Sequence, residues 1–263
     1  MPRTSGAIRG WLPFVLALAM LSGLAGLARA AGLNVAPVRL NLSAERTTAA
    51  LTLGNADEEE VGIQVEVMRW RQEDGRDLFE PTRDLVVNPG IFKVAGKGRQ
   101  IVRVGFQGKP GEVEGSYRVF LQQLPRAAQD ADGGTGVRLQ TLLRISIPIF
   151  VPPVTEARSD LSWRLVAASG KSPGGSRELS LQVVNRGNEH LQLTQVVVRR
   201  PDGTELARSP MSRYVLPGAS LAWPLQLPPL PPDAPLTIEV TSDARSPLPP
   251  IAVRTPHVGP AAD

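Results

Sequence analysis

The chain has 263 residues, no cysteine, two histidines and a formal net charge of +4 at pH 7. The lack of cysteine excludes disulfides, thiol catalysis and thiolate metal sites. The sequence contains no His-Glu-x-x-His motif and no clustered basic stretch of the kind that binds nucleic acid. We therefore predict a protein that is not an enzyme and that binds no cofactor, metal or nucleic acid.

The first thirty residues have the pattern of a cleaved signal peptide. Arg3 and Arg9 precede an apolar run, residues 11–27, that ends at the small-x-small site Ala28-Arg29-Ala30. An uncleaved membrane anchor is the alternative. The segment holds three arginines and no acid, so its removal lowers the formal charge from +4 to +1. We predict an exported protein with no stable membrane insertion after cleavage.

From residue 33 onward the hydrophobic pattern has a period of two, which is typical of β-strands, and no stretch of a dozen residues has a helical period. The alternation is clearest in residues 61–68, 101–106, 179–183 and 236–240. Turn sequences separate such stretches: Glu73-Asp74-Gly75, Asn88-Pro89-Gly90, Asp132-Gly133-Gly134, Pro201-Asp202-Gly203 and Pro217-Gly218. This pattern predicts an all-β protein.

The number of strands predicts two domains. About seven strands lie between Leu33 and Val151 and about seven more between Leu161 and Val253, and each set is the size of one immunoglobulin-like sandwich. Residues 152–160 begin with two prolines and then become polar, as expected of a linker. The sequence thus predicts two immunoglobulin-like β-sandwich domains in tandem, residues 31–153 and 154–258, followed by a disordered tail, residues 259–263.

One predicted strand, Thr135–Val151, is longer than the usual strand of about five or six residues. Its odd positions form an almost continuous apolar face. One interpretation is a long core strand at the end of the first domain. The other is an exposed edge strand that pairs with a second protein, because natural proteins normally protect apolar edges from aggregation. The pattern alone leaves both interpretations open.

Seven segments stand in an order that is typical of one protein family: residues 35–40, 86–94, 99–104, 114–125, 145–153, 183–188 and 214–218. They resemble the PapD-like periplasmic chaperones of Gram-negative chaperone–usher pili, and look closest to the archaic or spore-coat-type branch. The resemblance implies a boomerang arrangement of the two domains, a periplasmic location, and two partners, namely pilus subunits and an outer-membrane usher. The alternative is a structural pilus or adhesin subunit, or another exported β-sandwich binding protein.

The resemblance also implies a mechanism called donor-strand complementation. A family chaperone lends one of its strands to a pilin whose immunoglobulin-like fold lacks a strand, until the usher exchanges it for another subunit's extension. The donor residues implied here are Val137, Leu139, Thr141, Leu143 and Ile145. Main-chain bonds would supply affinity, and burial of each large aliphatic side chain is worth about 1.5–3 kcal/mol.

Family chaperones anchor the terminal carboxylate of the pilin with two basic residues in the cleft between the domains. Arg39 matches the first position, and a surface arginine is the alternative interpretation. The second position matches Pro148, which has no side-chain donor. Arg144, on the same face of that strand, and Arg103, on a neighbouring strand, are therefore the candidates for the second anchor.

The ion network between the domains also departs from the family pattern. Pro152 replaces the family's arginine, so its acidic partner, Glu114, has no assigned partner. His190 lies in a turn-like stretch and resembles a structural position of the family.

Overall fold

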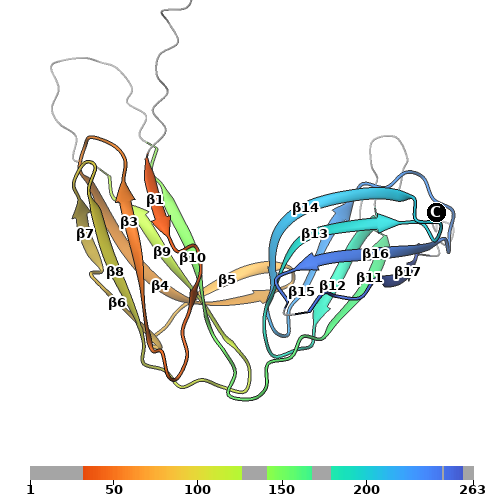
Figure 1. The fold of residues 1–263 in the computed structure, drawn as a ribbon, viewed down its shortest axis with the longest axis horizontal. Coiled ribbons are helices and arrows are strands. Elements are labelled where there is room, and N and C mark those ends of the chain that lie inside the picture. The colour runs from red at the N-terminus through yellow and green to blue at the C-terminus, as the bar shows by residue number, and fades with distance from the viewer. Residues whose placement is uncertain (1–31, 126–140, 168–178, 245, 257–263) are drawn as a thin grey trace, which may run out of the picture.

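The computed structural model describes residues 32–125, 141–167, 179–244 and 246–256. Within these ranges the chain forms strands β1 to β17 and no helix, and hence no helix that could cross a membrane. The strands build two lobes joined at a bend (Figure 1). The predicted all-β fold, with two immunoglobulin-like sandwiches in a boomerang arrangement, is confirmed.

The first lobe consists of two sheets packed face to face. One sheet has the order β1-β3-β8-β6 and contains β1 (Leu33–Ala36), β3 (Thr48–Asn55), β8 (Arg99–Phe106) and β6 (Leu85–Asn88). The other has the order β2-β10-β9-β4-β5, with β7 paired to β4. Its strands are β2 (Leu40–Asn41), β10 (Arg144–Val151), β9 (Gly115–Gln123), β4 (Val61–Glu73), β5 (Arg76–Pro81) and β7 (Ile91–Val94).

The alternating pattern of the sequence accounts for the core of this lobe. Successive side chains of a strand point to opposite faces of a sheet. Accordingly, the odd residues of β4 from Val61 to Val65 and the even residues of β8 from Val102 to Phe106 are buried. Ile147 and Ile149 of β10 pack into the same core. The facing apolar surfaces of the two sheets therefore close one sandwich.

The second lobe repeats this architecture with fewer strands. Its smaller sheet has the order β11-β12-β15, with β11 (Leu161–Ala167), β12 (Leu179–Asn185) and β15 (Ser220–Leu225). Its larger sheet has the order β14-β13-β16-β17, with β14 (Glu205–Val215), β13 (Leu191–Arg199), β16 (Pro235–Ser242) and β17 (Ile251–Arg254). The apolar side chains of the predicted alternations around residues 181 and 238 are again buried in the core.

Two of the predicted turns contain residues with positive φ angles, which accounts for the amino acids found there. Asp74 and Gly75 join β4 to β5 with φ angles of 50° and 73°, the pair of left-handed residues that a tight hairpin requires. Gly203, between β13 and β14, has a φ of 86°, which glycine adopts without steric cost. The turn predicted at residues 132–134 lies outside the described residues.

Two predictions about strands were wrong. The first lobe has ten described strands, not about seven, because the polypeptide crosses between sheets after β1 and folds two short strands, β6 and β7, beside β8 and β4. The long strand predicted from Thr135 begins only at Arg144 as far as the described residues extend, because residues 141–143 are not part of a ladder. Residues 126–140 are outside the described ranges.

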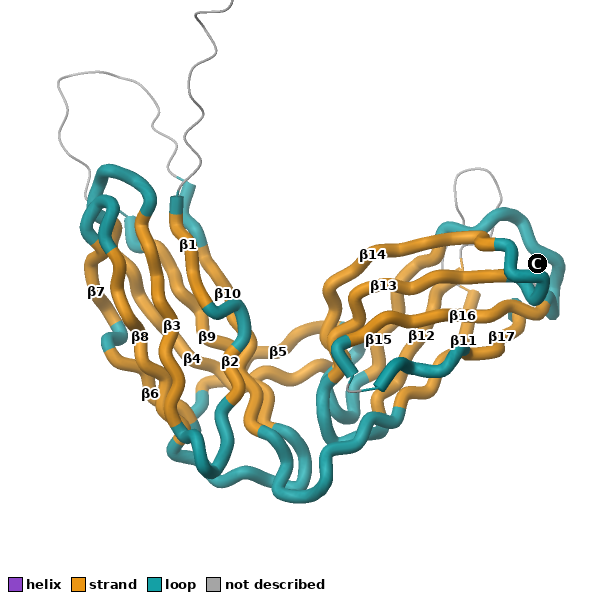
Figure 2. The backbone as a smooth tube through the Cα atoms, viewed as in Figure 1, coloured by secondary structure: helices purple, strands orange, loops and turns teal. Residues whose placement is uncertain are grey.

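The two lobes contact each other through the β4–β5 hairpin, which reaches from the first lobe toward the second (Figure 2). The Gln72 side chain donates to the carbonyl of Tyr214 at 3.1 Å and accepts from the main-chain N–H of Leu216 at 3.0 Å. The strands of the first lobe end at Val151 and those of the second begin at Leu161. The domain boundaries at residues 153 and 154 stay a prediction.

Candidate functional site

Strand β10 has one paired edge and one largely open edge. Its first side pairs with β9 along its whole length, whereas its second side meets β2 only at Ile149 and Phe150. The Phe150 carbonyl accepts a bond from the N–H of Leu42 at 2.9 Å, so its main-chain groups face this second side. Residues two apart in a strand face the same way. The main-chain N–H and C=O groups of Arg144 and Ser146 therefore point away from β9, in the plane of the sheet, where no described strand receives them.

The open edge explains a proline within a strand. Pro148 lies two residues before Phe150, so its nitrogen faces the same second side and no bond to β9 is lost. Proline is tolerated in sheets at such positions. An edge with a proline is also protected against indiscriminate pairing.

The burial of the side chains along this strand changes after Ile145. Ile147 and Ile149 are buried in the core of the first lobe, and Ile145 is half-buried against it. Leu143 is half-buried just before the strand, and Thr141 is exposed. Of the other residues predicted to form the donor strand, Val137 and Leu139 lie outside the described residues. The residues from Ile147 onward thus form a core strand, and the edge at Arg144 and Ser146 is open among the described strands, whereas pairing with a second protein stays a prediction.

Arg39 lies at the junction of the lobes rather than on an outer surface. Its Nη1 is 2.5 Å from Asp243 Oδ2, and its side chain is 34% exposed. Asp243 follows β16 and also accepts the N–H of Gln192 at 2.7 Å. The partner of Arg39 is a carboxylate 204 positions away in the sequence, which the local sequence pattern does not reveal.

The other two predicted anchors are not brought together. Arg103 lies in β8, on the first sheet, and its side chain is exposed. Arg144 lies in β10, on the second sheet, with its guanidinium 4.1 Å from the ring centroid of Phe120 and 3.9 Å from Glu66 Oε2. Arg144 is thus near the open edge, whereas Arg103 belongs to a different sheet.

Sequence reasoning missed Arg118, which pairs in register with Pro148 across β9 and β10. Its guanidinium lies 3.8 Å from the ring centroid of Trp70 and 5.5 Å from that of Tyr214, and its buried Nε has no hydrogen-bond partner among the described residues. Burial holds the pKa of Arg118 below its usual value. The available signal was an arginine inside the otherwise apolar segment that follows Tyr117.

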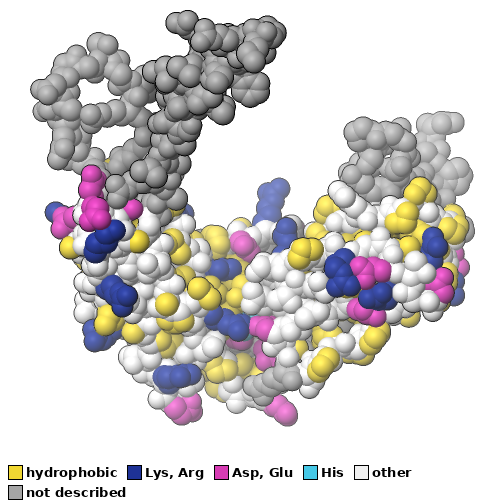
Figure 3. Space-filling model, turned by 45° about the horizontal axis from the view of Figure 1, so that its top comes forward, with side chains coloured by type: hydrophobic (Ala, Val, Ile, Leu, Met, Phe, Trp, Pro, Cys, Tyr) yellow, Lys and Arg dark blue, Asp and Glu magenta, His cyan; other side chains and the backbone are white. Residues whose placement is uncertain are grey.

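Arg118 lines a cavity of about 440 Å³ between the lobes. Its walls come from the β4–β5 hairpin on one side and from β14 on the other, and they include Trp70, Asp77 and Tyr214. Figure 3 shows basic and acidic side chains gathered on the surface between the lobes. A desolvated guanidinium on aromatic rings can bind a carboxylate strongly, because both charged groups are shielded from water.

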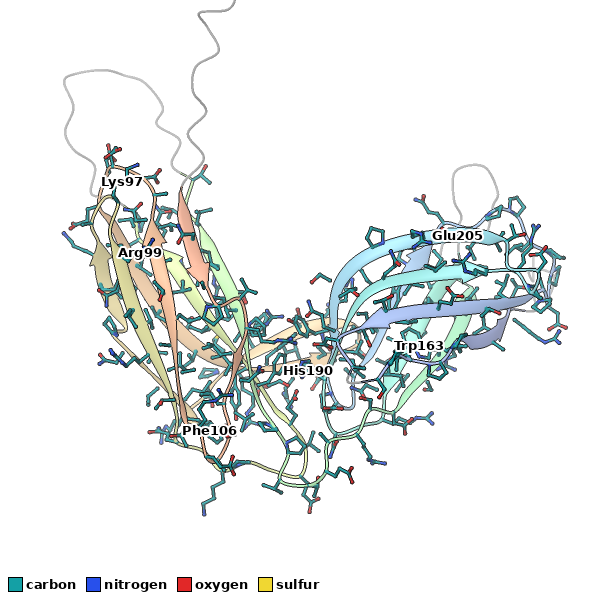
Figure 4. The ribbon with its side chains drawn as sticks, viewed as in Figure 1. Lys97, Arg99, Phe106, Trp163, His190 and Glu205 are labelled. Atoms are coloured by element: carbon teal, nitrogen blue, oxygen red, sulfur yellow. The ribbon has the colours of Figure 1, made fainter. Side chains whose placement is uncertain are left out.

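Glu114 and His190 form a second contact between the lobes. His190 Nδ1 lies 2.7 and 2.9 Å from the two oxygens of the Glu114 carboxylate. The His190 ring stacks on Phe150 with a centroid separation of 3.5 Å and an interplanar angle of 6°. Figure 4 places His190 at the junction of the lobes. Glu114, for which the sequence offered no partner, is therefore paired with a residue of the second lobe.

Comparison with protein families gives one match. Residues 32–156 match the sequence model of the family described as "Pili and flagellar-assembly chaperone, PapD N-terminal domain". No curated protein sequence matches the chain.

Several solved structures share the fold of both lobes. A chain of the CsuC–CsuE chaperone–tip adhesion subunit pre-assembly complex, from archaic chaperone-usher Csu pili of Acinetobacter baumannii, aligns with a TM-score of 0.61 and 17% identity, over 86% of this chain and 100% of that one. The Escherichia coli chaperone DraB aligns with a TM-score of 0.55 and 19% identity, over 86% and 98%. A chain of the Salmonella enterica SafA pilin–SafB chaperone complex gives 0.55 and 18%, over 86% and 97%. At these identities the likeness concerns the fold.

Proposed function

Since residues 32–156 place the chain among the PapD-like chaperones, we propose that it is a periplasmic chaperone that holds pilus subunits at the open edge of β10 by donor-strand complementation. We further propose that it delivers them to an outer-membrane usher. The observation that carries the proposal is the unpaired edge at Arg144 and Ser146. Two of the similar structures are complexes of a chaperone with a tip subunit or with a pilin, which supports a subunit as the partner.

The edge supplies two kinds of contact. The outward main-chain groups of Arg144 and Ser146 would bond to a strand of the subunit, as in other cases of β-augmentation. The apolar side chains that precede the core part of β10 would enter the subunit's groove. Leu143 and Ile145 are the described members of this set, and they are half-buried, so apolar surface is still available for a partner. Val137, Leu139 and Thr141 complete the proposed donor segment.

We propose that Arg118 is the second anchor for the subunit's terminal carboxylate. It stands beside Pro148 in the ladder, so it can occupy the space where a basic side chain at position 148 would lie. Its guanidinium is partly buried, and its Nε has no hydrogen-bond partner in the described part of the chain. Arg39 keeps the role of first anchor, since it lies at the same junction and is engaged by Asp243 in the free protein. Arg144 instead flanks the open edge, and Arg103 takes no part.

The function is tested by periplasmic co-expression with a pilus subunit that aggregates when produced alone. We expect a soluble complex of one chaperone and one subunit, measured by size-exclusion chromatography with light scattering. A subunit that remains equally soluble without this protein would contradict the proposal. A structural pilus subunit would instead assemble with copies of itself under the same conditions.

The open edge makes a prediction of its own. The substitution Ser146→Pro removes an N–H that faces the partner and leaves the ladder with β9 intact, so it should weaken the subunit complex about tenfold or more, because an unpaired acceptor costs about 1–3 kcal/mol. The melting temperature of the free protein should change little, since Pro148 already occupies the next position on this side.

Ser146→Ala is the matched control, because it keeps the N–H. Calorimetric titration with the subunit measures the affinity of both variants. Equal affinity of the Ser146→Pro variant and the native protein would show that the partner does not bond to this edge.

A further inference from the structure

The Glu114 carboxylate lies in an unusual setting for an acid. Its side chain is only 6% exposed, and both of its oxygens face His190, whose main-chain N–H also points to it at 3.3 Å. Across the described residues, no lysine or arginine lies within ion-pair distance of Glu114. A buried carboxylate without a positive partner is costly. His190 is the group that can supply that charge.

His190 faces a second carboxylate with its other ring nitrogen. Nε2 lies 3.9 Å from Asp243 Oδ2, and the side chain of His190 is 12% exposed. Arg39, which pairs with Asp243, and Tyr214, whose ring centroid is 5.7 Å away, also lie near the ring. The imidazole thus stands between an acid of the first lobe and an acid of the second.

The local sequence holds the ring in this place. His190 directly precedes β13, and its loop is fixed by Asn185, whose side chain donates to the carbonyls of Glu189 and Val215 and accepts the N–H of Gly187. A Cβ at Gly187 would lie 2.3 Å from the Arg158 carbonyl oxygen, so glycine is required there. Phe150 covers one face of the ring.

The charges of this cluster balance in only one state. Glu114 and Asp243 carry two negative charges and Arg39 carries one positive charge, so a neutral His190 leaves one uncompensated negative charge among these four residues. Protonation of His190 makes the cluster neutral and gives each carboxylate its own cation. An imidazole is the side chain that changes charge between about pH 5 and 8.

We propose that His190 is a positioning residue that latches the two domains together in its protonated form, with the imidazolium bridging Glu114 and Asp243. Loss of the proton removes one charge pair at the junction and widens the range of angles between the domains. The angle in turn sets the distance across the cleft between Arg118 and the second domain. This inference goes beyond the proposed function and does not depend on it, because it concerns the free protein.

The charge state of His190 can be read directly by NMR. The chain has two histidines, so ring ¹⁵N shifts of a histidine-labelled sample contain two sets of signals, and a His257→Ala variant assigns them. Between pH 5 and 8.5 we expect His190 to pass from the doubly protonated ring to the neutral one, with Nδ1 keeping its proton in the neutral form. A ring that stays neutral over the whole range would overturn the proposal.

The effect on the domains is measured by the distance distribution between two spin labels. Because the chain has no cysteine, labels can be placed at Ala50→Cys and Ala222→Cys, which are exposed positions of β3 and β15. We expect a narrow distribution at pH 5.5 and one about twice as broad at pH 8. His190→Asn keeps a donor near the position of Nδ1 without the charge, and should give the broad distribution at both pH values.

Glu114→Gln serves as the second variant, since it keeps an acceptor and removes the charge that the imidazolium must balance. It should abolish the pH dependence while the His257→Ala protein retains it. A pH response of the same size in both junction variants and in the native protein would overturn the latch, and so would a distribution that does not change while His190 titrates. The melting temperature confirms that each variant is folded.

Discussion

Replacing Arg118 with alanine should weaken the complex with a pilus subunit by roughly 30-fold or more. The guanidinium is partly buried over Trp70, and no described residue bonds to its Nε. Removal of one member of a buried charge pair at an interface costs about 2–5 kcal/mol, and each 1.4 kcal/mol is about tenfold in affinity. The measurement is the dissociation constant for a peptide with the terminal sequence of the subunit, compared with its C-terminal amide.

The amide is the internal control for this experiment. If Arg118 binds the terminal carboxylate, the amide should bind weakly to the native protein and equally weakly to the alanine variant. Arg118→Lys should recover part of the affinity, since it restores the charge without the planar pair of donors. Arg103→Ala is the matched surface control, because Arg103 lies on the other sheet of the same domain. A loss of affinity in that variant equal to the loss in Arg118→Ala would refute the assignment.

The second large effect is expected at the donor segment. The double substitution Leu139→Asp and Leu143→Asp should abolish the soluble complex with a subunit. Burial of each leucine is worth about 1.5–3 kcal/mol, and a buried carboxylate adds a further cost, so affinity should fall by more than about 100-fold. Co-purification from periplasmic extracts and calorimetric titration measure the loss.

Leu142→Asp is the control for the donor segment. Leu142 is 38% exposed and lies next to Leu143, so it tests whether any acid in this stretch is harmful. We expect it to bind the subunit normally. An intact complex with the double variant would rule out donor-strand complementation through these residues, although the fold of the protein would be unaffected.

Several features of the fold follow from local sequence. The alternation in residues 61–68 and 101–106 identifies β4 and β8 and the side of each that is buried. The Asp74-Gly75 turn fixes a hairpin, because both residues tolerate positive φ. These signals are local, since a strand's period and a turn's dihedral angles depend on adjacent residues. They cannot indicate how a strand's second edge is covered, which is why one long strand seemed equally suited to a core and to an interface.

The sequence by itself determined the class of the protein: an all-β chain of two sandwiches, with Arg39 at the cleft and an apolar strand near residue 145. Only the tertiary structure decided the electrostatics of the cleft. It pairs Arg39 with Asp243 across 204 positions and Glu114 with His190 across 76, and it sets Arg118 beside Pro148. The energy of charged groups depends on their distance and burial in space. For the two pairs that join the lobes, both quantities arise only when the domains pack against each other, and for Arg118 they arise when β9 and β10 pair within the first domain.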